Sequence, residues 1–98
     1  MAYQLIWSPM ARLDLRDLLA YIAEDDPLAA RNFARGVFSA VERLAEFPES
    51  GRVVPEFGES TIREVIRRPC LIVYRVRSEV RQVEIVRVWH GARGKPEL

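Results

Sequence analysis

The sequence predicts an α+β domain: an N-terminal strand, an α-helical hairpin and a three-stranded antiparallel meander, with the helices packed on one face of a single antiparallel sheet. Three observations predict it. A short strand-forming segment comes first, two amphipathic helical segments follow it directly, and three strand-forming segments close the chain. Helices and sheets bury their apolar faces against each other, so this order favours two layers. At 98 residues the chain is expected to form one domain, residues 1–98.

The first strand and the start of the first helix are marked by adjacent signals. Tyr3–Trp7 is short and rich in aromatic and aliphatic residues, which is typical of a strand. Ser8 and Pro9 follow, and serine caps a helix N-terminus while proline suits the first helical position. Apolar residues then recur at helical spacing as far as Ile22. A helix is therefore predicted to begin at Pro9.

The second helix repeats this start signal and has the clearest apolar stripe in the chain. Asp26 is the expected cap and Pro27 the first helical residue, and the stripe continues to Phe47, before Pro48. A turn of two or three residues between the helices would make them an antiparallel hairpin. Apolar residues that fall off the main stripes leave helix surface for a partner, and these are Leu13, Leu28 and Phe38.

The second half of the chain predicts a loop and then three strands. Residues 48–60 contain prolines, glycines and serines and are predicted to form a loop. The strands are expected over Ile62–Arg67, Leu71–Arg77 and Gln82–Trp89, with residues 78–81 as a hairpin loop between the last two.

The last of these strands is predicted to be central, because both of its faces carry apolar residues. Strict alternation would place Val83, Ile85, Arg87 and Trp89 on one face. Trp7 and Trp89 each end a strand, so we expect both near one rim of the sheet. Residues 91–98 are polar and are predicted to form a loose C-terminal tail.

Composition excludes several classes of protein. Hydrophobic residues make up 49% and charged residues 30% of the chain, which is the balance of a soluble globular domain. The run Leu71–Tyr74 is far too short to cross a bilayer, and no secretory signal is recognisable, so we expect a cytoplasmic protein with no membrane partner. The single cysteine, Cys70, excludes an internal disulfide and a cysteine-built metal site. Neither a metal nor another cofactor is expected.

Charge is distributed unevenly along the chain. Residues 1–50 carry a net charge of −3 and residues 51–98 a net charge of +4, and 14 of the 15 cationic residues are arginine. A basic half indicates a polyanion or an acidic protein as partner, since arginine binds carboxylate and phosphate in a planar, two-pronged geometry. A GC-rich genome is the alternative explanation for the arginine excess, although it does not account for the segregation.

Few residues are suited to catalysis. His90 is the only histidine, no phosphate-binding glycine loop is present, and no Gly-x-Ser-x-Gly motif occurs. Two interpretations of the arginines on the last three strands remain open. They grip phosphates, or they pair with Glu64, Glu79 and Glu84 or with the carboxylates of a partner. The arginines concerned are Arg63, Arg67, Arg75, Arg77, Arg81 and Arg87.

The order and spacing of several short motifs resemble a known superfamily. The chain resembles the toxins of bacterial type II toxin–antitoxin systems in the RelE/ParE superfamily, over nearly its whole length. The motifs are Ser8-Pro9-x-Ala11, Asp14-Leu15, Tyr21-Ile22-Ala23, Pro27-x-Ala29-Ala30, Leu44-Ala45-Glu46-Phe47-Pro48, Gly51-Arg52, Ile62-Arg63-Glu64, Ile72-Val73-Tyr74-Arg75-Val76 and Ile85-Val86-Arg87-Val88-Trp89-His90-Gly91-x-Arg93.

The resemblance implies one of two activities. ParE-like members inhibit DNA gyrase by binding, whereas RelE-like members are ribosome-dependent mRNA endonucleases. RelE-like nucleases place a catalytic arginine immediately before the strand that matches Ile72-Val73-Tyr74, and Leu71 stands there in this chain. A leucine cannot stabilise the charge that develops on phosphorus. The ParE-like activity is therefore favoured. The alternative nuclease would use Arg63, Arg75, Arg87, His90 and Arg93.

The resemblance also implies partners. We expect DNA gyrase as the target and a cognate antitoxin whose disordered tail folds on the toxin, giving a hetero-oligomer that reaches operator DNA only through the antitoxin. A toxin fold that retains only antitoxin binding is a third alternative. The residues expected to bind the target are Arg87, Trp89, His90, Arg93 and Lys95. Those expected to bind the antitoxin are Leu13, Leu28, Phe38, Arg75 and Arg77.

Overall fold

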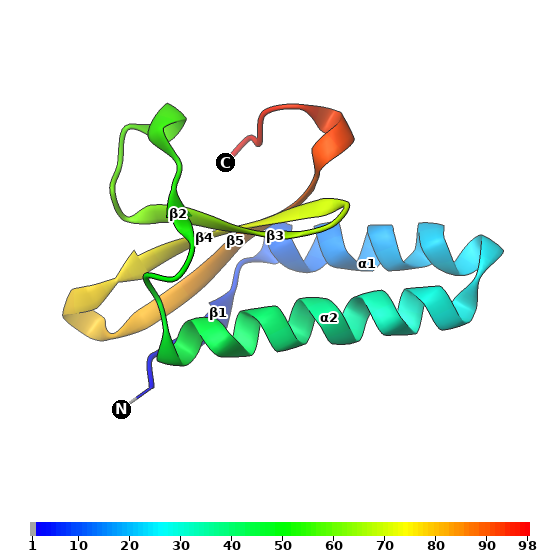
Figure 1. The fold of residues 1–98 in the computed structure, drawn as a ribbon, viewed down its shortest axis with the longest axis horizontal. Helices are drawn as coiled ribbons and strands as arrows, with labels where there is room; N and C mark the ends of the chain where they lie inside the picture. Colours follow the sequence, from blue (N-terminus) through cyan, green and yellow to red (C-terminus); the bar gives the residue numbers. More distant parts are fainter. Residues whose placement is uncertain (1) are drawn as a thin grey trace.

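Two long helices, α1 (Pro9–Asp25) and α2 (Pro27–Glu46), lie side by side against one face of a β-sheet (Figure 1). The architecture comes from a computed structural model, which describes residues 2–98. Both predicted caps are confirmed: the Ser8 side chain accepts a hydrogen bond from the Ala11 N–H, and the Asp26 carboxylate accepts one from the Ala29 N–H. The helices are joined by Asp26 alone, a tighter turn than the two or three residues expected.

The sheet has five strands in the spatial order β1-β5-β4-β3-β2. The three C-terminal strands confirm the predicted antiparallel meander, and β5 is central as predicted. Two expectations were wrong. β1 pairs parallel to β5, so the sheet is mixed, and a short strand forms inside the predicted loop 48–60. The strands are β1 (Gln4–Trp7), β2 (Arg52–Val53), β3 (Ile62–Arg67), β4 (Cys70–Arg77) and β5 (Gln82–His90).

The predicted alternation along β5 is also wrong, because the strand contains a bulge. Tyr74 of β4 is opposite Ile85, whereas the preceding Val73 is opposite Arg87, so Val86 has no partner. One extra residue reverses the faces of everything that follows it. Ile85 and then Val88 face the helices and join the core, while Arg87 moves to the opposite face.

The core lies between the helices and the sheet. It is built from the apolar stripe of α2, from Ala11 and Leu15 of α1, and from the helix-facing side chains of β4 and β5. The opposite face of the sheet carries two short segments, the connection from β2 to β3 and the C-terminal residues, which rise from it in Figure 1. The fold therefore leaves a helix-covered face and a face covered only in part.

Candidate functional site

Arg87 lies at the junction of α1 and β5, where Asp14 binds it in a two-pronged geometry. The Nε and Nη2 atoms of Arg87 donate to the two carboxylate oxygens of Asp14 at 2.7 and 2.9 Å. One of those oxygens also accepts the Val88 N–H at 3.0 Å. Both side chains are buried, and Asp14 raises the pKa of Arg87 further, against the opposing effect of burial. Arg87 therefore ties the first helix to the sheet.

Trp89 is buried by the C-terminal residues. Its indole N–H donates to the Gly94 carbonyl at 3.0 Å, and the Arg93 guanidinium lies 3.9 Å from the ring centroid. Arg87 donates its remaining Nη1 to the Glu97 carbonyl at 2.8 Å. A loose tail was expected over residues 91–98, but the structure gives these residues specific contacts with β5. The expectation that Trp7 and Trp89 share one rim was wrong, since Trp7 faces the helices and packs on Phe38.

Arginines near β2 and the loop ends of β4 and β5 are paired with carboxylates. Salt bridges join Arg52 to Glu64 at 2.8 Å and Arg77 to Glu84 at 2.8 Å, which confirms the predicted role of those two glutamates. Longer pairs join Arg63 to Glu49 and Arg75 to both Glu59 and Glu84, at 3.7–3.9 Å. We call Arg52, Arg63, Arg75 and Arg77 the paired arginines.

The five residues of the alternative nuclease do not converge on one point. Arg63 is opposite Tyr74 on the helix side of the sheet, and its guanidinium donates to the carbonyls of Glu49 and Gly51. Arg75 is opposite Glu84 on the other face. Arg87 is occupied by Asp14. His90 and Arg93 alone line a common cavity, of about 240 Å³, together with Asp14 and Asp17 of α1.

The residues expected to bind a target separate into two groups. Arg87 and Trp89 are buried and hold the fold together. Arg93 and the side chain of His90 reach the surface at the end of β5, and the His90 Nδ1 atom accepts a hydrogen bond from the Ala92 N–H. Lys95 lies further along the same C-terminal segment. Burial therefore separates the five expected target-binding residues into two groups. The sequence did not show this, because an aromatic residue at the end of a strand has the same local pattern whether or not a later segment covers it.

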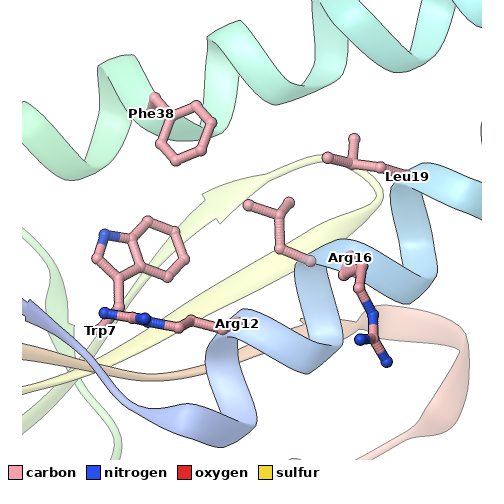
Figure 2. Close-up of a pocket in the computed structure, with 6 residues that line it drawn as sticks. Trp7, Arg12, Arg16, Leu19 and Phe38 are labelled. Atoms are coloured by element: carbon pink, nitrogen blue, oxygen red, sulfur yellow. The ribbon is translucent and has the colours of Figure 1, made fainter.

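An apolar groove lies between the two helices and β1 (Figure 2). Trp7 and Phe38 point toward one another across it, with ring centroids 5.7 Å apart. Arg12 extends beside Trp7, and Arg16 extends away from Phe38. The groove has a volume of about 440 Å³ and is lined by Trp7, Arg12, Leu15, Arg16, Leu19 and Phe38, which we call the helix groove.

The residues expected to bind an antitoxin also lie in different places. Phe38 lines the helix groove, and Leu13 and Leu28 are exposed on the helices without lining it. Arg75 and Arg77 share the opposite face of the sheet, where both pair with Glu84. All three apolar residues are exposed on the helices, as their spacing predicted. Trp7, which faces Phe38 across the groove, had been expected at a sheet rim.

A second basic region lies at the turn between β3 and β4, and it contains Arg68, to which the sequence analysis assigned no role. Within residues 2–98, no carboxylate lies within 4.0 Å of the charged nitrogens of Arg67, Arg68 or Arg93. The Arg67 guanidinium lies against Gly36 of α2, where a side chain would overlap it. We call Arg67, Arg68 and Arg93 the cationic turn. Its signal in the sequence is two consecutive arginines at the end of a predicted strand.

Cys70 lies beneath this turn and is unsuited to nucleophilic chemistry. Its side chain is buried, opposite His90 on the neighbouring strand. Burial raises the pKa of the thiol to about 11, and the negative charge of Asp14 contributes in the same direction. At neutral pH the thiol is therefore protonated, which makes it a poor nucleophile and metal ligand. No group of three or more metal-binding side chains occurs in the described part of the chain.

Comparison with known proteins now decides the family. The family model described as the ParE toxin of the type II toxin–antitoxin system parDE matches residues 5–94. The chain belongs to this toxin family. The resemblance to the RelE/ParE superfamily that the motifs indicated is thereby confirmed, and the chain is a type II toxin of the ParE/RelE kind.

Among the proteins similar to this ParE-family toxin, some carry the name RelE and others the name ParE. Toxin RelE2 of Caulobacter vibrioides is 38% identical over 91 residues, which are 92% of this chain and 97% of the relative. The chromosomal ParDE system of P. aeruginosa shares the fold, with a TM-score of 0.72 at 21% identity over 91% of this chain and 96% of that one. The toxin–antitoxin complex RelBE2 of Mycobacterium tuberculosis matches with a TM-score of 0.60 at 26% identity, over 92% and 99%.

The ParE-family toxin has no helix within residues 2–98 that is long and apolar enough to span a membrane.

Proposed function

We propose that this ParE-family toxin stops bacterial growth by binding DNA gyrase, without breaking a bond in RNA. It acts in the cytoplasm, where gyrase works on the chromosome. The family model supports the gyrase-directed activity, since its description names the ParE toxin. The relative named RelE2 keeps the ribosome-dependent nuclease as the second candidate.

The placement of the arginines carries this proposal. Cleavage of a phosphodiester needs cationic groups that converge on one phosphate, and removing one such group costs roughly two to three orders of magnitude in rate. Arg63 and Arg75 lie on opposite faces of the sheet, and the Arg87 guanidinium is shared between Asp14 and the Glu97 carbonyl. Leu71 occupies the position of the superfamily's catalytic arginine. This arrangement favours binding over cleavage.

The cognate antitoxin is the second partner that we propose, and the helix groove is its docking site. Apolar residues line the groove, and two cationic side chains of α1, Arg12 and Arg16, lie on one side of it (Figure 2). An amphipathic helix with acidic residues beside its apolar stripe complements this surface, since apolar anchors enter a groove at helical spacing. Neutralised toxin is therefore a hetero-oligomer with this antitoxin.

The deciding experiment measures DNA supercoiling by gyrase in the presence of purified toxin. We expect inhibition and accumulation of cleaved DNA at micromolar toxin, both reversed by the co-expressed antitoxin. Toeprinting on translating ribosomes is run in parallel. Codon-specific cleavage that disappears in His90→Ala, without any effect on gyrase, would overturn the proposal in favour of the nuclease.

A further inference from the structure

A cavity of about 530 Å³ lies at the cationic turn, away from the helix groove. It is formed where the β3–β4 turn meets the end of β5, and the Gly91 N–H holds these parts together by donating to the Pro69 carbonyl. Its walls are mostly apolar. The residues that matter here are Ile66, Arg68, Pro69, Leu71, His90 and Ala92.

The neighbouring edge of the sheet is unpaired. β2 is only two residues long and pairs with Arg63 and Glu64 of β3, so residues 65–67 of β3 pair with β4 on one side and have no strand on the other. Ile66 in this stretch is 63% exposed. It also lines a further cavity beside β2, of about 280 Å³, so the two cavities share Ile66 at the open edge. An unpaired edge of this kind accepts an extended peptide as an added strand.

The charge around this edge is positive. Arg68 lines the cavity, and Arg67 precedes it in the chain. Glu64, which lines the cavity beside β2, is paired with Arg52. Asp14 and Asp17, which share a cavity with His90, are paired with Arg87 and Arg16. Positive charge without an internal partner favours an acidic ligand.

We propose that an acidic, extended segment of the toxin's protein target docks here, pairing with the β3 edge and placing one apolar side chain in the cavity. Carboxylates on either side of that anchor bind Arg67 and Arg68. The apolar cavity and the open strand edge favour a peptide over a single-stranded nucleic acid, whose bases stack mainly on aromatic side chains, because no Phe, Tyr or Trp lines this cavity. The inference rests on the proposed function and adds the surface through which the toxin recognises its target.

The test compares two double variants that make the same chemical changes. Ile66→Asp/Arg68→Glu alters the proposed surface. Val80→Asp/Arg35→Glu is the matched control, because Val80 is 56% exposed in the β4–β5 turn and Arg35 is an exposed residue of α2. Circular dichroism and thermal unfolding first establish that both variants are folded. Gyrase inhibition and binding to the antitoxin are then titrated for each.

We expect the first variant to need at least about tenfold more protein for half-inhibition of gyrase, the size of effect typical of a central contact, and to retain antitoxin binding. The control is expected to match the unmodified toxin. Equal inhibition by both variants would overturn the docking proposal, as would selective loss of antitoxin binding. So would a loss of affinity for a short DNA duplex alone, which would assign the surface to nucleic acid.

If the proposed function is wrong, the assays give a different set of results from those that would overturn the docking proposal. If the unmodified toxin leaves gyrase untouched, gyrase is not the target, and the same two variants are compared by growth arrest in cells. Loss of arrest only in Ile66→Asp/Arg68→Glu, with antitoxin binding intact, then supports docking of another target at this surface. Equal arrest by both variants overturns it.

Discussion

The paired arginines and the cationic turn occupy the same sheet and are built from the same residue type, yet their surroundings differ. Arg52, Arg63, Arg75 and Arg77 each lie within 4.0 Å of a glutamate. Arg67 and Arg68, at the turn between β3 and β4, have no glutamate or aspartate within this distance in residues 2–98. Arginine is therefore structural on one part of this sheet and available on another.

This difference shows that the role of an arginine in this fold depends on whether a carboxylate lies beside it, and not on its charge alone. The glutamates that pair come from the loop after α2, from the β2–β3 connection, and from β3 and β5, and the fold brings each of them beside a paired arginine. Within residues 2–98, neither Arg67 nor Arg68 of the β3–β4 turn has a carboxylate within 4.0 Å. A basic residue that the fold leaves unpaired keeps its full attraction for an external carboxylate.

The largest expected effect tests the most deeply buried pair. Asp14→Ala removes both acceptors of Arg87 and the acceptor of the Val88 N–H. We expect the free energy of unfolding to fall by about 3–5 kcal/mol, because an uncompensated guanidinium remains where both side chains were buried. Urea unfolding followed by circular dichroism measures this loss as a lower midpoint.

Arg77→Gln is the matched control for this prediction. Its pair with Glu84 has similar length, 2.8 Å, but the Arg77 side chain is 41% exposed. Solvent screens such a pair, so we expect a loss of less than about 1 kcal/mol. An equal loss of unfolding free energy in Asp14→Ala and Arg77→Gln would show that burial does not determine how much an arginine–carboxylate pair of this sheet contributes to stability.

A pair of glycines gives the next largest contrast. Gly51 lies beneath the paired arginines, and a Cβ atom there would lie 2.5 Å from the Tyr74 hydroxyl and 2.6 Å from the Glu64 carbonyl oxygen. The backbone cannot yield easily, and the Gly51 N–H also donates to Tyr74. We expect Gly51→Ala to cost about 1–3 kcal/mol of unfolding free energy, measured by thermal and urea unfolding.

Gly36→Ala makes the same change beneath the cationic turn, where the atoms in the way belong to the mobile end of the Arg67 side chain. That guanidinium can swing away, and alanine in mid-helix gains about 0.5–1 kcal/mol over glycine. We therefore expect stability to be kept or slightly raised. A loss as large as that of Gly51→Ala would mean that Arg67 is fixed in place like the paired arginines.

Much of the fold followed from local signals in the sequence. Ser8-Pro9 and Asp26-Pro27 predicted both helix starts, because capping depends on adjacent residues alone. The three C-terminal strands were found within one residue of their observed ends. The parallel pairing of β1 with β5 and the two-residue β2 depend on contacts between distant segments, which no local pattern records.

The bulge at Val86 explains why the site was harder to predict than the fold. Alternation placed Arg87 and Trp89 beside Ile85, and one unpaired residue moved them to the other face. There the C-terminal residues cover Trp89. The residue types of Arg87 and Trp89 predicted an interface at both positions. Both are buried instead, because the one extra residue at the bulge changes the face of the sheet on which they lie.

The smallest expected effect concerns Cys70, beneath the cationic turn. Burial raises the pKa of its thiol from an ordinary value near 9.0 to about 11 in the folded chain. Between these values the unfolded chain binds fewer protons than the folded chain, so stability is present below pH 9 and is lost as the pH rises toward 11. From pH 8 to pH 10 the titration of the thiol should lower the free energy of unfolding by about 1 kcal/mol. Tyr74, whose pKa burial also raises, acts in the same direction.

Cys70→Ala therefore serves as the reference, since it removes only the thiol titration. The free energy of unfolding of each protein is measured by urea unfolding as a function of pH, and the profiles of the unmodified toxin and of Cys70→Ala should converge above pH 9. Parallel profiles would mean that solvent reaches the thiol beneath the turn.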